Sequence, residues 1–461
     1  MEQRETGLFI FRRDFRIIDN NGLHWLSFRC KNIHPIFIFT PEQVGGANDF
    51  KSNNAVQFMI EGLQDLKREI SKKGGTLTCF YGKNPSIIKD IIRAAKIDLV
   101  CFNRDYTPYA KKRDDEIFEL CAKMGVECES VPDYYLHEPD TILNGSGETY
   151  QKFTPYYESA KHVKIQQIYT YPVHFSNQSL SSGSKISLEE AVRKFTKINH
   201  DILVHGGRAP ALLAMKTAEK NLRGYSRKRD DLTHRTSLMS AYIKFGCVSI
   251  REVYYKFKAN VAFTRQLMWR DFYAAILNAY PRVLGKALKP AYDKVKWGHN
   301  KRWFDAWCNA KTGFPIVDAA MTEMNTTGYM HNRARLIVAS FLTKTLLLSW
   351  KEGEKYFATK LTDYDPASNN GNWQWVASTG ADSQPYFRIF SPVEQAKRFD
   401  PECKYIKKWL PELDKLTPKT IHNWETAYAE PENKGVYHKP IVDFKEQREK
   451  ALDMFKRVFT G

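Results

Sequence analysis

The sequence has no closely spaced cysteine pair, no long hydrophobic run and no GxGxxG motif. Its eight cysteines are scattered, which argues against a zinc site or a redox dithiol and favours reduced thiols. Residues 1–5 contain no apolar signal region, and no apolar span is long enough to cross a bilayer. We therefore expect a soluble intracellular protein without a bound metal, in the cytoplasm or, in a eukaryote, the nucleus.

Acidic residues are scarcer than basic ones. Asp and Glu number 52 against 70 for Lys and Arg, which gives a formal net charge of +18. A balance this basic suggests an acidic partner, most often a nucleic acid. The alternative is a lysine-rich surface that faces only solvent, and charge alone leaves both interpretations open. With 461 residues, the chain is too long for one compact core, so we expect two domains.

The first part of the chain alternates strand-like and helix-like patterns. Short apolar runs occur at residues 8–11, 33–39, 76–81 and 99–102, with helical periodicity at 56–72 and 85–95. This alternation predicts an α/β domain at 1–135 with a doubly wound parallel sheet. The polar tract at 176–184 indicates a flexible connector over 136–187. Residues 188–461 are helical without repeats, which predicts a larger all-α domain.

The segment FRRDFRIIDN, at residues 11–20, follows the first predicted strand. Ligands of parallel sheets bind at the carboxyl ends of strands, so this segment is well placed for one. Without GxGxxG, a Rossmann-type dinucleotide site is not expected. The residues alone favour a second interpretation, a surface ion-pair cluster.

Two segments of the helical region combine binding chemistry with ordinary helix features. Hydroxyls at Thr236, Ser237 and Ser240 at a helix start suit a pyrophosphate, although such residues are also common N-caps. Farther along, a set at helical spacing would suit an aromatic ring stacked on an indole beside a cation: Gln266, Trp269 and Arg270. The alternative is a buried tryptophan with an ion-paired arginine.

The most informative runs are GYMHNRAR at 328–335 and DYDPASNNGNWQW at 363–375. A buried core requires aliphatic residues at helical spacing, whereas these runs gather amides, charges and tryptophans. They indicate a large polar aromatic ligand such as a flavin or a base. An interior Arg335 needs an acidic partner, for which Asp363 and Asp365 are candidates. His331 is interpreted as structural.

Several motifs occur in an order known from one family: TGFPIVDAAM at 312–321, MHNR at 330–333, NNGNWQW at 369–375 and WLPEL at 409–413. Over nearly its whole length the chain resembles the DNA photolyase/cryptochrome flavoproteins, most closely the class I-like cyclobutane pyrimidine dimer photolyases. The resemblance implies a deoxyribodipyrimidine photo-lyase that binds FAD in its helical domain and repairs UV-damaged DNA as a monomer. The dimer, flipped out of the duplex, would be split by electron transfer from photoexcited reduced FAD. A six–four photoproduct photolyase and a cryptochrome-type blue-light receptor are the alternatives.

Carried over by position, the resemblance implies a set of FAD-binding residues: Tyr225, Thr236, Ser237, Ser240, Arg335, Asp363, Asp365 and Asn369. Arg335 would pair with Asp363, and Asn369 would face the flavin N5 atom. Electrons would reach the flavin from the surface through three tryptophans: Trp297, Trp350 and Trp373.

The resemblance also implies residues that bind the substrate. Trp269 would stack on the lesion, with Gln266 and Asn332 in contact with it. Together with Asn369, these three would form the catalytic set. Flanking DNA would be bound by further residues: Arg270, Arg333, Trp375 and Arg388.

The chain departs from the family pattern at several positions. Gln266 replaces a glutamate usual in cyclobutane-dimer enzymes, Leu336 replaces a methionine and Tyr329 a tryptophan. Glutamine is similar to six–four enzymes, but those use a histidine pair where this chain has His331 and Asn332. Because Asn332 cannot protonate a lesion, the cyclobutane dimer is favoured.

A second, antenna chromophore is implied near Arg12, Asp14 and residues 103–109. It would be a deazaflavin or a folate. Folate-binding relatives often carry a glutamate where this run has Thr107, which argues against folate. The chain also ends at Gly461 without the long tail typical of signalling cryptochromes, which favours repair.

Overall fold

The N-terminal region contains one sheet of five parallel strands in the order β3-β2-β1-β4-β5. The structure is a computed structural model that describes residues 3–460. The strands are β1 Arg4–Phe11, β2 Cys30–Phe39, β3 Thr78–Tyr81, β4 Leu99–Asn103 and β5 Glu127–Val131. The direction in which strands are added reverses between β1 and β4, which places the binding crevice of such sheets at their carboxyl ends.

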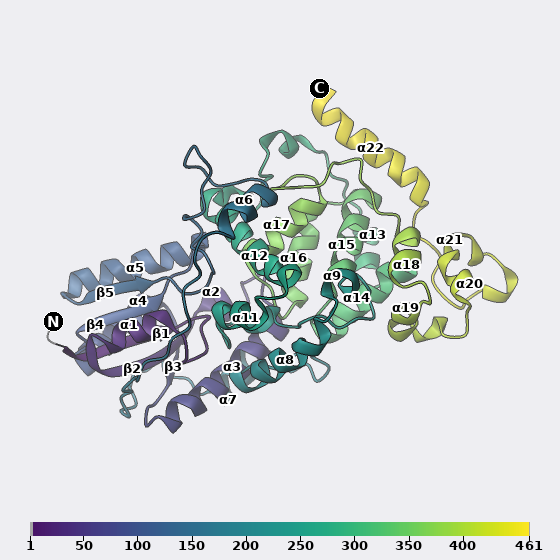
Figure 1. Cartoon of the computed structure of the whole chain (residues 1–461). Coiled ribbons are helices and arrows are strands. Elements are labelled where there is room, and N and C mark those ends of the chain that lie inside the picture. The colour runs from purple at the N-terminus through teal and green to yellow at the C-terminus, as the bar shows by residue number, and fades with distance from the viewer. Residues whose placement is uncertain (1–2, 461) are drawn as a thin grey trace.

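Helices cover both faces of this sheet (Figure 1). They are α1 Asn21–Ser27, α2 Pro41–Val44, α3 Asn53–Lys72, α4 Asn84–Ala95 and α5 Pro108–Met124. Alternate residues of β1 point to opposite faces, so Leu8 and Ile10 pack with α4, whereas Phe9 and Phe11 pack with α1 and α3. The predicted doubly wound sheet is confirmed. The fifth strand was missed because its glutamates give an edge strand little apolar signal.

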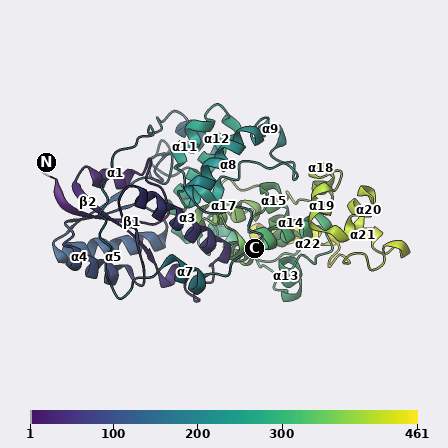
Figure 2. The same cartoon turned by 90° about the horizontal axis from the view of Figure 1, so that it is seen from below.

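The rest of the chain is helical, and it extends from the sheet to α18–α21 at the far end of the molecule (Figures 1 and 2). Its helices are α6 Phe153–Ala160, α7 Leu188–Phe195, α8 Arg208–Asn221, α9 Tyr225–Lys228, α10 Ser240–Lys244, α11 Ile250–Phe257, α12 Val261–Ala279, α13 Lys301–Cys308, α14 Pro315–Thr327, α15 Asn332–Ser340, α16 Trp350–Lys360, α17 Pro366–Val376, α18 Pro392–Phe399, α19 Lys404–Trp409, α20 Pro418–His422, α21 Trp424–Ala427 and α22 Phe444–Thr460. A π-helical turn, η3 Phe341–Thr345, continues α15. None of the described helices is long and apolar enough to cross a membrane.

The polar connector between the two regions is bound along the edge of the sheet. Ser176 donates its backbone N–H to the Ile33 carbonyl at 2.8 Å, and Tyr81 donates to the Ser184 carbonyl at 2.8 Å. The predicted flexible linker is therefore held by backbone hydrogen bonds, which a polar composition does not reveal.

The segment at residues 11–20 forms ion pairs as predicted, but not on the surface. Arg16 is 1% exposed and lies 2.5 Å from the Asp133 carboxylate. Arg251 of α11 bonds Asp19 at 2.8 Å and Asp133 at 2.7 Å. The prediction of a surface cluster is wrong because the carboxyl end of β1 faces the helical region. The cluster is a buried junction between the two parts of the chain.

Candidate functional site

The informative runs converge where α17 packs against α12, α15 and α16 (Figure 1). Two glycines permit this close packing. A Cβ atom on Gly371 of α17 would lie 2.1 Å from Tyr273 Cδ1 of α12, and one on Gly353 of α16 would lie 2.1 Å from Trp373 Cη2. Gly371 in the NNGNWQW run is therefore required for the close packing of α17 against α12, apart from any role of the run in binding a ligand.

The predicted ion pair between Arg335 and Asp363 is present. Arg335 Nη2 donates to both carboxylate oxygens of Asp363, at 3.0 and 3.2 Å, and Nε donates to the Met330 carbonyl at 2.8 Å. Burial lowers the pKa of Arg335, but the Asp363 carboxylate outweighs it, and the pKa lies above its ordinary value. The pair is fixed and charged, as recognition of a polar ring edge requires.

Asp365, the other candidate, pairs with the sheet domain instead. Its Oδ2 accepts from Arg13 Nη1 at 2.9 Å, and its Oδ1 accepts from the Ser368 N–H at 3.0 Å as the N-cap of α17. Burial raises the pKa of Asp365, but Arg13 and Arg270 outweigh burial and lower it to about 2. The FAD contact of Asp365 stays a prediction, and its role at the junction was missed.

The two adjacent asparagines of α17, Asn369 and Asn370, have different environments. Asn369 is half-buried and donates its amide N–H to the Glu354 carbonyl at 3.0 Å, which fixes the amide against α16. Asn370 is 2% exposed and donates to Val283 O and to Glu354 Oε1, both at 2.8 Å. Asn370 is thus structural, and of this pair Asn369 is the one with an accessible side.

The predicted pyrophosphate segment lies beside the GYMHNRAR run. Tyr329 hydrogen-bonds Thr236, and burial raises the pKa of Tyr329 to about 12. Ser237 Oγ accepts from the Met239 N–H at 3.3 Å, and Ser240 begins α10 with an exposed side chain. Tyr225, at the start of α9, packs edge-on against Phe263 of α12. Of these residues, Thr236 is linked to Arg335, because the Arg335 guanidinium lies 5.6 Å from the ring of Tyr329.

The three predicted electron-transfer tryptophans lie at different depths. Trp350 and Trp373 are each 2% exposed, whereas Trp297 is half-buried against Phe455. Trp307, which the sequence did not single out, is fully buried, 6.2 Å from the Trp373 ring centroid. Trp297 is therefore the outermost of the three, and the electron route through them stays a prediction.

The residues predicted to contact the lesion, together with Trp375 of the predicted flanking-DNA set, occupy neighbouring helices. Gln266 and Trp269 of α12 and Trp375 of α17 are half-buried, and Asn332 is exposed at the start of α15. One face of Trp269 stacks on Phe153 of α6, with ring centroids 3.8 Å apart and planes at 10°. Phe153 had no local signal in the sequence, because its role depends on contact with a distant helix.

The three arginines predicted to bind phosphates differ in whether their guanidinium groups already have partners within the protein. Arg388 is exposed. Arg270 donates to the Tyr134 carbonyl at 2.6 Å, and Arg333 pairs with Asp230 at 2.9 Å. A phosphate would have to compete with these contacts, so phosphate binding by Arg270 and Arg333 stays a prediction.

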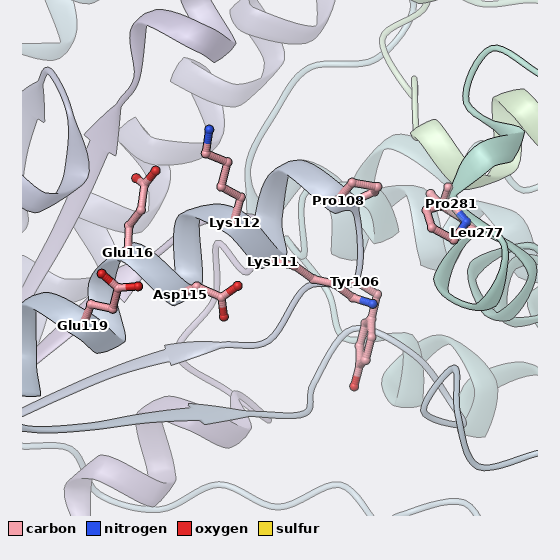
Figure 3. Close-up of a pocket in the computed structure, with 9 residues that line it drawn as sticks. All are labelled: Tyr106, Pro108, Lys111, Lys112, Asp115, Glu116, Glu119, Leu277 and Pro281. Carbon is pink, nitrogen blue, oxygen red and sulfur yellow. The ribbon is translucent and has the colours of Figure 1, made fainter.

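The predicted antenna residues divide between two places. Asn103 is buried at the end of β4, where its amide donates to Asp14 at 2.5 Å. Arg12 lies over the Phe102 ring, and its Nη2 has no hydrogen-bond partner among the described residues, nor does Arg113 Nη2. Tyr106 and Pro108 instead line a cavity of about 490 Å³ between α5 and the end of α12 (Figure 3).

Comparison with known proteins identifies the family. Residues 8–172 match the profile of DNA photolyase, and residues 263–457 match that of the FAD binding domain of DNA photolyase. A deoxyribodipyrimidine photo-lyase from Alkalihalophilus pseudofirmus is 35% identical over 97% of each chain.

Two solved structures extend this match. An archaeal photolyase from Sulfolobus tokodaii, described with two FAD molecules and an implied light-harvesting cofactor, has a TM-score of 0.89 at 37% identity over 98% of this chain and 100% of its own. A Synechocystis cryptochrome has a TM-score of 0.90 at 25% identity over 98% of this chain and 100% of its own. The chain belongs to the DNA photolyase family.

Proposed function

We propose that the protein is a light-driven deoxyribodipyrimidine photo-lyase that uses FAD to repair pyrimidine dimers in UV-damaged DNA. The observation that carries the proposal is the packing of α17, which carries Asn369 and Trp375, against α15 with Arg335 and α12 with Trp269, while Asp363 pairs with Arg335 just before α17. A flavin site and a base-stacking site thus share one set of helices, as electron transfer between them requires.

The residues present fit FAD. Near the Arg335–Asp363 pair, the buried Nε2 atom of His331 has no hydrogen-bond partner among the described residues. A buried polar atom without a partner is a feature that a bound polar ligand would explain. The Asp363 carboxylate and the Asn369 amide would hold the isoalloxazine, and Thr236 and Ser237 the pyrophosphate. When bound and reduced, FAD supplies light absorption and an electron for the dimer.

The chain's own residues orient the reactants. Trp269, supported from behind by Phe153, offers its other face to a flipped base, and base–aromatic stacking contributes about 1–3 kcal/mol per base. Gln266 and Asn332 would donate amide N–H groups to the lesion. Arg388 would bind a flanking phosphate.

The environment of His331 supports the cyclobutane dimer as the substrate. Burial lowers the pKa of His331 to about 4, and its Nδ1 accepts from the Arg333 N–H at 3.1 Å. At neutral pH this imidazole is therefore uncharged, with the bonded nitrogen as an acceptor. A proton donor for a six–four lesion would need the opposite state.

The lesion assay tests the function directly. We expect chemically reduced protein under near-UV light to restore an oligonucleotide with a cyclobutane thymine dimer and to leave a six–four oligonucleotide unchanged. Samples kept in the dark are the controls. Repair of only the six–four lesion would show that Gln266 indicates the substrate better than His331 and Asn332. No repair of either by FAD-loaded protein would favour a blue-light receptor.

Replacement of Trp373 by phenylalanine should separate photoreduction from repair. Phenylalanine is harder to oxidise than tryptophan, so we expect light-driven reduction of the bound oxidised flavin to slow on the order of tenfold or more, about 1.4 kcal/mol of added barrier. Repair by chemically reduced Trp373→Phe protein should remain largely intact. Flavin absorbance during illumination measures the first rate, with Trp25→Phe in α1 as the control. Lost repair in the reduced variant would contradict the electron-route assignment.

The second chromophore would lie at the carboxyl ends of β1 and β4. Arg12 Nη2 and Arg113 Nη2 are unused donors there, and buried donors of this kind suit an anionic group. Flavin and deazaflavin cofactors carry phosphate and folates carry carboxylates, so these donors suit either kind of anionic chromophore.

A further inference from the structure

Lys344 is a buried lysine within the π-helical turn η3. Its side chain is fully buried, and no described carboxylate forms an ion pair with it. Its Nζ donates to Ser378 Oγ at 2.9 Å and to the Arg388 carbonyl at 3.1 Å. Burial, reinforced by the nearby Arg388 cation, lowers the pKa of Lys344 to about 7. Burial of an amine is costly, so these two hydrogen bonds are the contacts that hold it there.

The carbonyl that Lys344 binds belongs to a solvent-facing loop at residues 383–390. The side chain of Phe387 is 62% exposed, and Arg388 is exposed beside it. Lys344 therefore reaches the loop backbone from the protein interior at the residue whose guanidinium faces solvent.

Two other contacts anchor the same loop. The Tyr386 ring stacks on Phe455 of α22, with centroids 5.7 Å apart and planes at 18°. The Phe390 N–H donates to Ser340 Oγ at 3.3 Å. Lys344 Nζ also lies 6.0 Å from the Phe455 ring. Tyr386 and Phe390 are thus anchored on either side of Arg388, and Lys344 binds the Arg388 carbonyl itself.

We propose that Lys344 is a positioning residue for DNA binding, which fixes the backbone of Arg388 so that its guanidinium meets a DNA phosphate. This inference rests on the proposed function, in which Arg388 binds such a phosphate. Fixing the loop before DNA arrives reduces the ordering cost of binding. The contact is to the backbone, so an alanine at position 388 would not remove it, whereas loss of the amine would loosen the backbone at Arg388 between the two other anchors.

The test replaces Lys344 by methionine, which keeps the chain length and burial but removes every N–H donor. Binding of a fluorescent duplex with a single thymine dimer is measured by anisotropy over a range of salt concentrations. We expect Lys344→Met to weaken binding about five- to tenfold and to reduce the slope of log K against log salt by about 0.9, as loss of one phosphate contact does. Arg388→Ala should give the same changes. The double variant should lose little more, because both single changes remove one contact.

Thr345→Val is the matched control. Thr345 lies on the same turn, and its buried hydroxyl has no hydrogen-bond partner among the described residues, so binding should be unchanged. An unaltered affinity in Arg388→Ala would refute the phosphate contact itself. If Arg388→Ala weakens binding while Lys344→Met leaves the salt slope unchanged, or the two losses add fully, the positioning role is refuted. Should the methionine variant fold poorly, Lys344→Gln retains an amide donor and should bind more tightly than Arg388→Ala; equal loss would count against the proposal.

Discussion

An Asp365→Asn protein is expected to lose about 3 kcal/mol of unfolding free energy, although asparagine is as good an N-cap as aspartate. The reason is that Asp365 forms a buried ion pair with Arg13 at the junction between the helical region and the sheet domain. The Asp365 and Arg13 side chains are each 9% exposed, and removal of the carboxylate charge leaves Arg13 with Asp105, at 3.2 Å, as its one ionic partner among the described residues. Urea unfolding followed by far-UV circular dichroism measures the loss.

The same substitution should also change how the free energy of unfolding depends on pH under acidic conditions. The folded pKa of Asp365 is about 2, whereas an unfolded aspartate titrates near ~3.9. Because the folded value is depressed, the contribution of Asp365 is fully present above about pH 4 and is lost as the pH falls toward 2. Unfolding of the Asp365→Asn protein should lack this part of the acid dependence.

Asp49→Asn is the matched control for Asp365→Asn. Asp49 pairs with Lys355 across the same two regions at 2.7 Å, but the side chains are 69% and 48% exposed. A pair in water contributes about 0–1 kcal/mol, so this variant should be nearly as stable as the parent. Similar small losses in both variants would show that the buried pair is not a stabilising contact.

Gly353→Ala is expected to destabilise the helical region by about 2 kcal/mol net and to impair photoreduction. The new Cβ would lie 2.1 Å from Trp373 Cη2 and 2.6 Å from Leu342 Cδ2. Alanine favours a helix by about 1 kcal/mol over glycine, but overpacking a rigid core costs about 1–3 kcal/mol, or more where nothing can move. Trp373 is 2% exposed, so α16 and α17 would have to separate.

Urea unfolding and the initial rate of flavin photoreduction together test this prediction. Gly46→Ala is the control, because a Cβ there meets no atom within 4 Å. A Gly353→Ala protein as stable as the parent, with an unchanged photoreduction rate, would mean that the two helices adjust freely and that Trp373 has no fixed position.

How well the sequence predicts a contact depends on how far apart its two residues lie in the chain. An interior Arg335 required a carboxylate, and the nearby aspartates limited the choice to two, so local chemistry predicted the pair. Nothing local connects Arg13 to Asp365, which is 352 positions later. Local patterns report periodicity and side chains that need a partner, and they predicted four strands of the parallel sheet and the helical character of the rest, but not β5 at the sheet edge.

The same limit explains the missed aromatic contacts. Phe153 and Trp307 are ordinary apolar residues on short helices, and their importance comes from Trp269 and Trp373, which lie on other helices. The loop at residues 11–20 was placed on the surface for a related reason. Its charge pattern is common on surfaces, and the packing of distant elements such as α11 and the start of α17 against it buries it.

The buried junction also sets an order of events during synthesis. Asp133 emerges from the ribosome 118 residues before Arg251, its partner from α11. At typical elongation rates this delay is on the order of ten seconds. All five strands precede Asp133, so the sheet can assemble in that interval, while Asp19 remains hydrated and Asp133 has only Arg16. The nascent sheet domain therefore keeps a polar, water-covered face until the first helices of its neighbour arrive to close it.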